Sequence, residues 1–327
     1  MARTPPSRTR RDDYLEGLAA IIKDLGESDV PLGDVKIAHG ALAEMVQAFK
    51  VFSNYRTTRK ITAFGSARTQ PGAAVFELAE RFSRAIADHG FMVITGAGPG
   101  IMEAAQRGAG RERSFGVNIR LPHEQGANAV ILGDVKLINF RYFFTRKLFF
   151  LKEADAVVLF PGGFGTHDEG YETLTLLQTG KTRPVPLILL DQPGGTYWKA
   201  WRQYVVEHLL RRRMIDEADL ALFNVTTDVD EAVNEILRYY HVFHSIRYVG
   251  DLLVIRIEQP LAEDALEGLR RDFQDIVASG TIEQRDALPV EQDEPDLINM
   301  PRLVLRFDRR NYGRLRTLID RINDAGF

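Results

Sequence analysis

Short apolar runs and amphipathic stretches alternate along the middle of the chain. The apolar runs predict strands over residues 61–64, 91–95, 115–119, 156–160, 185–190 and 220–225. The stretches between them have apolar residues at helical spacing and predict helices over residues 73–88, 100–110, 139–153, 165–180, 197–211 and 228–240. This alternation favours an α/β fold, in which a doubly wound, Rossmann-like and mostly parallel sheet is covered by helices on both faces.

Both ends of the chain depart from this alternation. Helical spacing predicts two N-terminal helices within residues 14–57, separated by a break at Pro31 and Gly33. After about residue 244 the expected order is strand, helix, strand, strand and helix, over residues 252–257, 261–278, 282–288, 302–307 and 312–322, with acidic residues 291–296 as a loop. We therefore expect a tail and helical extension (1–58), a Rossmann-like domain (59–243) and a small C-terminal α+β module (244–327).

Length and charge restrict the class of protein. A chain of 327 residues is long enough for two domains. Its formal net charge of −3 provides no broad positive field, so neither nucleic acid nor a membrane surface is expected as a partner. The absence of cysteine excludes disulfides, thiolate nucleophiles and cysteine metal sites. The basic first eleven residues, which we interpret as a frayed tail, lack the apolar segment of a secretory signal, so we expect a cytoplasmic protein.

Three glycine-rich turns follow predicted strands. They have the sequences FGSAR (residues 64–68), TGAGPGIME (95–103) and PGGFGTHDE (161–169). In doubly wound sheets, ligands bind beyond the carboxyl ends of the strands, and glycine turns with free amides at a helix start favour phosphate. The second turn has Ile101 where a dinucleotide fingerprint requires its third glycine, and residues 118–120 lack the expected acidic ribose ligand. A nicotinamide cofactor is therefore not expected.

The third turn allows two interpretations. Thr166 and Glu169 have the spacing of a capping box, which would give them a purely structural role. Alternatively, Glu169 and Glu172 share one helix face at the mouth of a phosphate loop. Because a carboxylate repels phosphate, such a pair suggests a second task, either binding sugar hydroxyls or stabilising a cation.

The predicted helix over residues 139–153 carries apolar and basic residues. Its apolar stripe is expected to face the core and consists of Phe140, Phe144, Leu148 and Leu151. Arg146 and Lys147 are either ordinary solvated charges or ligands for the same cleft. The second interpretation is open because the helix leads directly into the strand before the third turn.

These segments together resemble the Lonely Guy family. The resemblance rests on YFFTRK (residues 142–147), PGGFGTHDE (161–169) and GPGIMEAA (98–105), and it covers about residues 60–240. Members of this family are phosphoribohydrolases that release the base from cytokinin riboside monophosphates and often from AMP. Many were long described as "possible lysine decarboxylase". The helical extension and the C-terminal module are additional to the minimal family domain.

The resemblance implies a set of site residues. Arg146 and Glu169 correspond to the catalytic pair. The resemblance also implies a set of residues that bind the 5′-phosphate or the rest of the nucleotide: Gly65, Ser66, Gly98, Gly100, Lys147, Gly162, Gly163, Gly165, Thr166 and Glu172. His167 departs from the family pattern, which usually has an aliphatic residue there.

The residue types suit cleavage of an N-glycosidic bond. Departure of the base builds oxocarbenium character on the ribose, and Glu169 could stabilise this charge and orient or deprotonate water. Arg146 stays protonated at any relevant pH, so it is better suited to holding phosphate or donating a hydrogen bond to the base. We expect no metal and no cofactor, since His241 and His244 lack a third ligand nearby.

The sequence thus predicts hydrolysis of a nucleoside 5′-monophosphate to free base and ribose 5-phosphate. The alternative is a non-catalytic carrier or sensor, similar to molybdenum-cofactor carriers, that uses the same phosphate loop. A pyridoxal-phosphate decarboxylase is not supported, because no lysine lies in a setting suited to a Schiff base. The family resemblance implies at least a homodimer, and the C-terminal module either binds a small effector or extends an oligomer interface.

Overall fold

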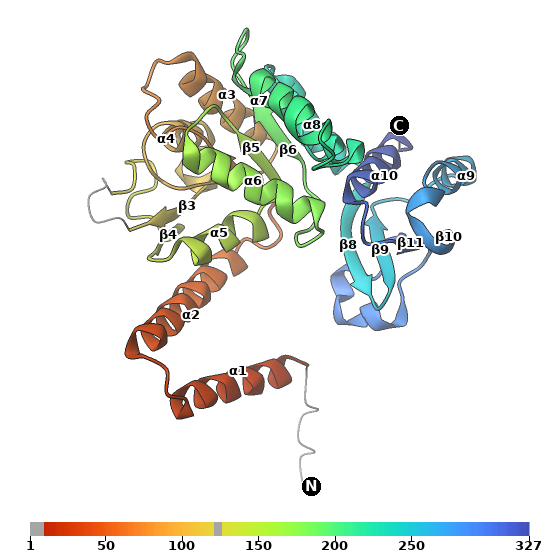
Figure 1. Cartoon of the computed structure of the whole chain (residues 1–327), viewed down its shortest axis with the longest axis horizontal. Helices are drawn as coiled ribbons and strands as arrows, with labels where there is room; N and C mark the ends of the chain where they lie inside the picture. Colours follow the sequence, from red (N-terminus) through yellow and green to blue (C-terminus); the bar gives the residue numbers. More distant parts are fainter. Residues whose placement is uncertain (1–9, 121–125, 327) are drawn as a thin grey trace.

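The computed structural model describes residues 10–120 and 126–326, which form two sheets (Figure 1). The larger sheet has seven strands in the order β4-β3-β2-β1-β5-β6-β7, and all its neighbouring strands are parallel. Its strands are β1 (Lys60–Phe64), β2 (Met92–Thr95), β3 (Ser114–Ile119), β4 (Leu137–Phe140), β5 (Ala156–Leu159), β6 (Leu187–Leu190) and β7 (Asn224–Thr226). The predicted α/β class and parallel sheet are confirmed.

Helices cover both faces of this sheet. They are α3 (Ala74–Asp88), α4 (Ile101–Ala109), α5 (Phe143–Lys152), α6 (Phe164–Gln178), α7 (Tyr197–Tyr204, continued by a π-helical segment Val205–Leu210) and α8 (Val229–Tyr239). Alternate residues of β1 face opposite sides, because Ile61 joins the core beneath α3, α4 and α8, whereas Phe64 joins the core beneath α5, α6 and α7. The doubly wound arrangement follows from these two cores.

The predicted helix over residues 139–153 was wrong at its start. Asn139 and Phe140 belong to the edge strand β4, where Asn118 of β3 donates to Asn139 Oδ1 at 3.0 Å. Half of the predicted core stripe was wrong, since Phe144 is 58% exposed and Leu148 43% exposed, whereas Phe140 and Leu151 are buried as predicted. Strand pairing removes residues 139 and 140 from the predicted helix and so changes which residues of α5 face the core.

The strand predicted over residues 220–225 begins later than expected. Residues Glu217–Leu222 form a 3-10 helix, and β7 covers only Asn224–Thr226. The side chains of Asp216 and Asp219 cap the 3-10 helix reciprocally, so local hydrogen bonds there replace strand pairing.

Two helices precede the sheet, as predicted. They are α1 (Arg10–Glu27) and α2 (Leu32–Ser53), with Pro31 at the N-cap of α2. Phe52 packs on the core beside Phe149 of α5, whereas α1 buries none of its residues. The expected tail lies mostly in residues 1–9, outside the described part of the chain, and its last two residues begin α1. Within the described ranges, no helix has the length and apolar character needed to cross a bilayer.

The smaller sheet is antiparallel and belongs to the C-terminal module. Its order is β10-β11-β9-β8, from strands β8 (Phe243–Val249), β9 (Leu252–Ile257), β10 (Val277–Arg285) and β11 (Arg302–Phe307), with helices α9 (Glu263–Asp272) and α10 (Tyr312–Asp324). The α+β class is confirmed. Strand β8 was not predicted, and the helix expected to reach residue 278 ends at Asp272, because β10 starts at Val277 and pairs with β11.

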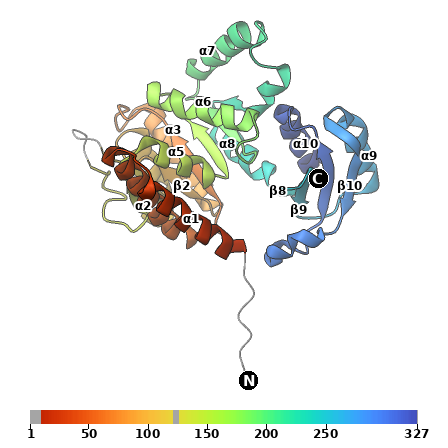
Figure 2. The same cartoon turned by 60° about the horizontal axis from the view of Figure 1, so that its bottom comes forward.

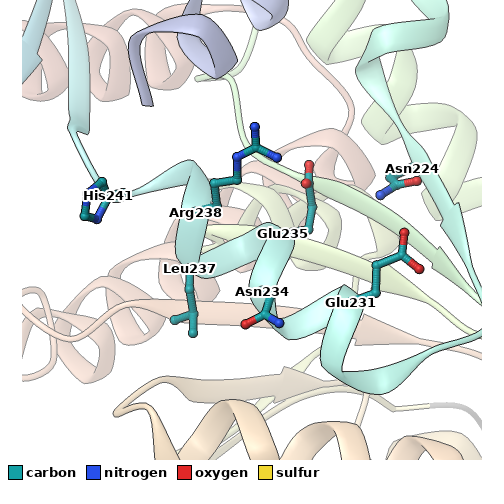
Figure 3. Close-up of a pocket in the computed structure, with 7 residues that line it drawn as sticks. All are labelled: Asn224, Glu231, Asn234, Glu235, Leu237, Arg238 and His241. Atoms are coloured by element: carbon teal, nitrogen blue, oxygen red, sulfur yellow. The ribbon is translucent and has the colours of Figure 1, made fainter. Parts of the chain in front are cut away.

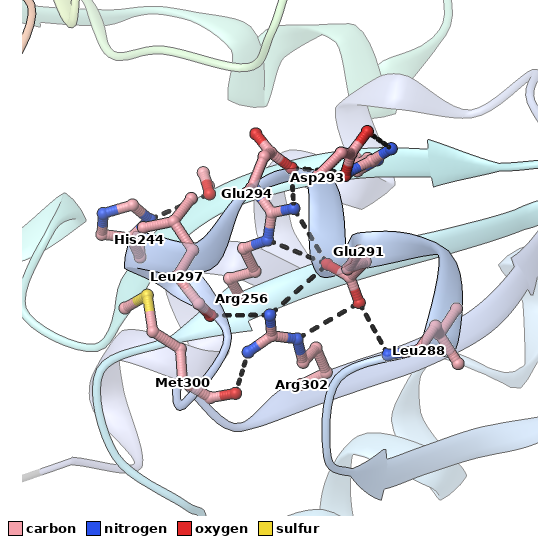
Figure 4. A network of polar contacts seen from close by, with 11 residues as sticks. His244, Arg256, Leu288, Glu291, Asp293, Glu294, Leu297, Met300 and Arg302 are labelled. Carbon is pink, nitrogen blue, oxygen red and sulfur yellow. Dashed lines mark hydrogen bonds and ion pairs between the residues drawn. The ribbon is translucent and has the colours of Figure 1, made fainter. Parts of the chain in front are cut away.

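The acidic stretch 291–296, expected as a loop, forms two 3-10 turns and carries a buried carboxylate (Figure 4). Arg302 and Arg256 stand opposite each other on β11 and β9, where like charges repel. Glu291 accepts from Arg256 Nη2 at 2.9 Å and from Arg302 Nε at 3.3 Å, and all three side chains are at most 3% exposed. This ion-paired network fixes residues 289–297 over one face of the small sheet.

The C-terminal module packs against the α/β unit through α10, which contacts α8 and α6 (Figure 2). Arg316 of α10 donates to Glu235 of α8 at 2.6 Å, and Asn323 of α10 donates to the backbone oxygen of Tyr239. The hydroxyl of Tyr240 donates to the backbone oxygen of Asp155, the residue that precedes β5. The division of the chain at residue 243 remains a prediction.

Candidate active site

The three glycine turns meet at the carboxyl edge of the large sheet, because β2, β1 and β5 are neighbours. The amide of Ile101 donates to Ser66 O at 3.0 Å, and the amide of Ser66 donates to Pro161 O at 3.2 Å. Gly100 has a φ of +69°, and a Cβ there would lie 2.3 Å from Ser66 O. A Cβ at Gly162 would lie 2.1 Å from Thr166 Oγ1 of its own turn and 2.9 Å from the amide nitrogen of Ser66 in the first turn. These two glycines are therefore required for the turns to pack against one another.

Gly65 and Gly98 have a packing role as well. A Cβ at Gly65 would lie 2.6 Å from the Ile101 side chain, and one at Gly98 would lie 2.7 Å from Met102 Cε. Both glycines, which the sequence predicted as nucleotide-binding residues, thus lie where the start of α4 packs against the first two turns.

The third turn presents unused amides at the start of α6. Gly163 is the N-cap, and the amides of Thr166 and His167 both donate to its carbonyl oxygen. Among the described residues, no acceptor receives a hydrogen bond from the amides of Gly163, Phe164 or Gly165. No atom lies within 4 Å of an added Cβ at Gly163 or Gly165. Open space and free amides at a helix N-terminus are features that favour binding of an anion.

The predicted capping box at Thr166 was wrong. The helix begins before Thr166, and no side chain caps it. Thr166 and Glu169 are instead buried on the inner face of α6, 5% exposed each. The two glycines before Phe164 allow this earlier start, because they leave the backbone free to enter the helix without a side-chain cap.

Lys147 of α5 lies among three carboxylates of α6. Its Nζ is 2.7 Å from Asp168 Oδ2, 2.7 Å from Glu172 Oε2 and 3.9 Å from Glu169 Oε1. Burial lowers the pKa of Lys147, but hydrogen bonds to Asp168 and Glu172 outweigh burial and raise it overall. A charged lysine therefore occupies the middle of the acidic group. Within the described ranges, no group of three histidine or carboxylate side chains is arranged to hold a metal ion.

Glu169 is the buried acid of this group. Burial raises its pKa to about 7, and the positive charges of Lys147 and Arg146 oppose the rise. The two residues predicted as a catalytic pair thus interact electrostatically. A carboxylate that titrates near neutral pH beside a glycine turn with free amides is typical of a functional site.

Arg146 extends from α5 toward the second turn. A Cβ at Gly96 would lie 4.0 Å from its Nη1. Its guanidinium carbon lies 5.0 Å from the ring centre of Phe143 and 5.3 Å from that of Phe150. These contacts direct the positive charge toward the edge of the sheet where the glycine turns meet.

Two residues near the turns were missed by sequence reasoning. Asn128 Nδ2 donates to Gly98 O at 3.0 Å and so supports the second turn. Tyr197 of α7 donates from its hydroxyl to Gly162 O at 2.5 Å and so supports the third. Neither residue lies in a motif, and each is about 30 residues from its partner. No local signal in the sequence could have identified them.

Larger hollows lie elsewhere on the molecule. A groove of about 840 Å³ lies along α8 and the edge strand β7. Figure 3 shows the residues that line it: Asn224, Glu231, Asn234, Glu235, Leu237, Arg238 and His241. A second groove of about 600 Å³ shares Asn224 and Glu231 with it. Neither lining includes a residue of the glycine turns, so the candidate site rests on chemistry rather than on cavity size.

Comparisons with known proteins bear on this site. Residues 100–236 match the family model described as "Possible lysine decarboxylase", and they include Arg146 and Glu169. None of the curated proteins compared with the chain matches it.

Several solved structures are similar to part of the chain. The X-ray structure of TM1055 is 24% identical, covers 55% of this chain and 99% of its own, and has a TM-score of 0.39. The molybdenum cofactor carrier protein of Chlamydomonas reinhardtii is 20% identical over 55% of this chain and 97% of its own, with a TM-score of 0.37. DNA processing protein A of Helicobacter pylori is 16% identical over 57% of this chain and 84% of its own, with a TM-score of 0.39.

The match confirms the resemblance noted from the sequence motifs. Residues 100–236 run from the second glycine turn to α8, and so include the third turn and both helices that carry the charged residues. Residues 100–236 are therefore similar to the family described as "Possible lysine decarboxylase", a description that many Lonely Guy proteins long carried.

Proposed function

We propose that this protein hydrolyses the N-glycosidic bond of a nucleoside 5′-monophosphate, either AMP or a cytokinin riboside monophosphate. The products are the free base and ribose 5-phosphate. The observation that carries this proposal is the position of Glu169, a buried carboxylate on the same helix as the free amides of the third turn.

The spacing along α6 suits such a substrate. Glu169 follows Gly163–Gly165 by four to six residues, which is roughly 6–9 Å along a helix. This is comparable with the separation of the 5′-phosphate from the anomeric carbon in a nucleotide. A phosphate on the amides would therefore bring the sugar beside the carboxylate.

The chemistry follows from the charges. The bond between the anomeric carbon and the base nitrogen breaks, and its electron pair leaves with the base. Ionised Glu169 stabilises the positive charge on the sugar and accepts a proton from the attacking water, whose oxygen bonds to the anomeric carbon. Arg146 cannot supply a proton at neutral pH, so it attracts the phosphate or donates a hydrogen bond to the departing base.

Lys147 has a tuning role in this scheme. Its positive charge lowers the pKa of Glu169 and opposes the effect of burial. Without that charge the carboxyl would be protonated over more of the neutral range and could not accept a proton from water.

The direct test is incubation of the purified protein with AMP and with isopentenyladenosine monophosphate, followed by chromatography for the free base. Glu169→Gln should abolish release of the base but keep nucleotide binding. Glu77→Gln, which removes an exposed carboxylate from the first turn of α3, is the matched control and should keep full activity. Tight binding of AMP by the wild type with no release of base would favour the carrier or sensor instead.

A homodimer remains part of the proposal. Three aromatic side chains around the candidate site are exposed: Phe143 by 49%, Phe144 by 58% and Phe164 by 96%. Apolar side chains at these positions support a second subunit that covers the site. Size-exclusion chromatography with light scattering measures the mass, and a monomer at micromolar concentration would contradict this part.

A further inference from the structure

Tyr197 is held rigidly at the start of α7. Its amide donates to Asp191 Oδ2 at 2.9 Å, and Asp191 is 3% exposed at the end of β6. Its ring lies edge-on to Trp198, with 4.7 Å between the ring centres, and Trp198 is 1% exposed. The tyrosine therefore has little freedom to leave its place beside the third turn.

A chain of two hydrogen bonds runs from His167 through Tyr197 to the turn. The hydroxyl of Tyr197 has one proton and donates it to Gly162 O at 2.5 Å. The 2.6 Å contact between His167 Nε2 and the same hydroxyl must then have the imidazole as donor. A neutral imidazole with its proton on Nε2 meets this requirement, and burial lowers the pKa of His167.

The hydrogen bond to Gly162 O also determines the direction of an amide. In a trans peptide the C=O of one residue and the N–H of the next point in opposite directions. Since Gly162 O is held toward α7, the N–H of Gly163 points away from α7. That amide has no partner among the described residues. Two adjacent glycines would otherwise leave this peptide free to rotate.

We propose that Tyr197 and His167 are positioning residues for the phosphate-binding turn. The chain from His167 Nε2 through the Tyr197 hydroxyl to Gly162 O keeps the Gly163 amide aimed at the 5′-phosphate. This inference rests on the proposed function only in its choice of phosphate ligand.

The test measures binding of ribose 5-phosphate by calorimetry and steady-state kinetics with AMP. Tyr197→Phe removes one hydroxyl and should weaken ribose 5-phosphate by about 3- to 10-fold, the usual effect of one lost hydrogen bond. The KM for AMP should rise by the same factor, with a smaller change in kcat. His167→Leu should give a weaker form of this defect, and His167→Gln, which keeps a donor, should restore binding.

Tyr204→Phe is the matched control, because Tyr204 ends the same helix, is 48% exposed and contacts His208 rather than the turn. Thermal melting of each variant separates lost stability from lost affinity. Unchanged affinity of a folded Tyr197→Phe for ribose 5-phosphate would overturn the inference. If Tyr197→Phe does not fold, equal affinities of His167→Leu and His167→Gln would overturn it. A wild type that binds ribose 5-phosphate but never cleaves AMP refutes the proposed function alone. A wild type that cleaves AMP, with affinity for ribose 5-phosphate and KM for AMP unchanged in Tyr197→Phe, refutes the inference alone.

Discussion

Glu169→Gln should make the protein more stable above neutral pH. The native carboxyl has a pKa of about 7, compared with 4.5 for an unperturbed glutamate. The folded state therefore holds its proton more tightly than the unfolded state, and the free energy of unfolding falls as the pH rises from about 4.5 to 7. A difference of about 2.5 units corresponds to about 3 kcal/mol of lost stability, at about 1.36 kcal/mol per unit.

Glutamine has the shape of the protonated acid but cannot ionise. Near pH 4.5 the variant and the wild type should have about the same free energy of unfolding, because the native acid is protonated there. At pH 8 the variant should be more stable by up to about 3 kcal/mol. Above pH 7 the difference should stay constant, since the carboxyl is then ionised in both states.

Urea unfolding followed by circular dichroism at pH 5 and pH 8 measures this difference. Comparing the two proteins at each pH cancels the contributions of all other titrating groups. Glu77→Gln, an exposed glutamate on α3, controls for the loss of one negative charge. An equal stability difference at pH 5 and pH 8 would refute a raised pKa for Glu169, and with it the argument that this buried acid is kept for catalysis at the expense of stability.

Three further predictions concern Lys147, Gly100 and Glu291. Lys147→Met removes a positive charge that lowers the pKa of Glu169. The acid limb of the pH profile of kcat/KM for AMP should therefore move to higher pH, and an unchanged limb would show that Lys147 does not affect the titrating acid. Gly110→Ala, at a φ of +75° and a ψ of 162° in open space, should cost about 1–3 kcal/mol in urea unfolding from backbone strain alone. Gly100→Ala also forces a Cβ to 2.3 Å from a backbone oxygen and should cost clearly more; similar costs would contradict the close packing of the turns. Glu291→Gln leaves buried Arg302 without a carboxylate and Arg256 with Glu294 alone, so it should cost about 3 kcal/mol, and an unaffected unfolding midpoint would contradict the buried network.

The sequence determined the elements whose pattern depends on near neighbours. The alternation of apolar runs with amphipathic stretches was enough to predict the parallel sheet and most of the helices that cover it. The glycine turns were visible for the same reason, since backbone freedom is a property of single residues. The charged residues of the site were visible too, because the motifs that contain Arg146, Lys147 and Glu169 are continuous segments.

Only the tertiary structure decided features that depend on distant partners. Asn139 became a strand residue because β3 was available to pair with it, and β10 replaced the end of a predicted helix because β11 lay beside it. The pKa of Glu169 depends on burial and on charges from another helix, and neither effect is known until the fold places these groups together. Tyr197 reaches Gly162 across 35 positions of the sequence. Local spacing determines which residues can form an element, but the balance of burial, pairing and charge is fixed only when distant segments meet.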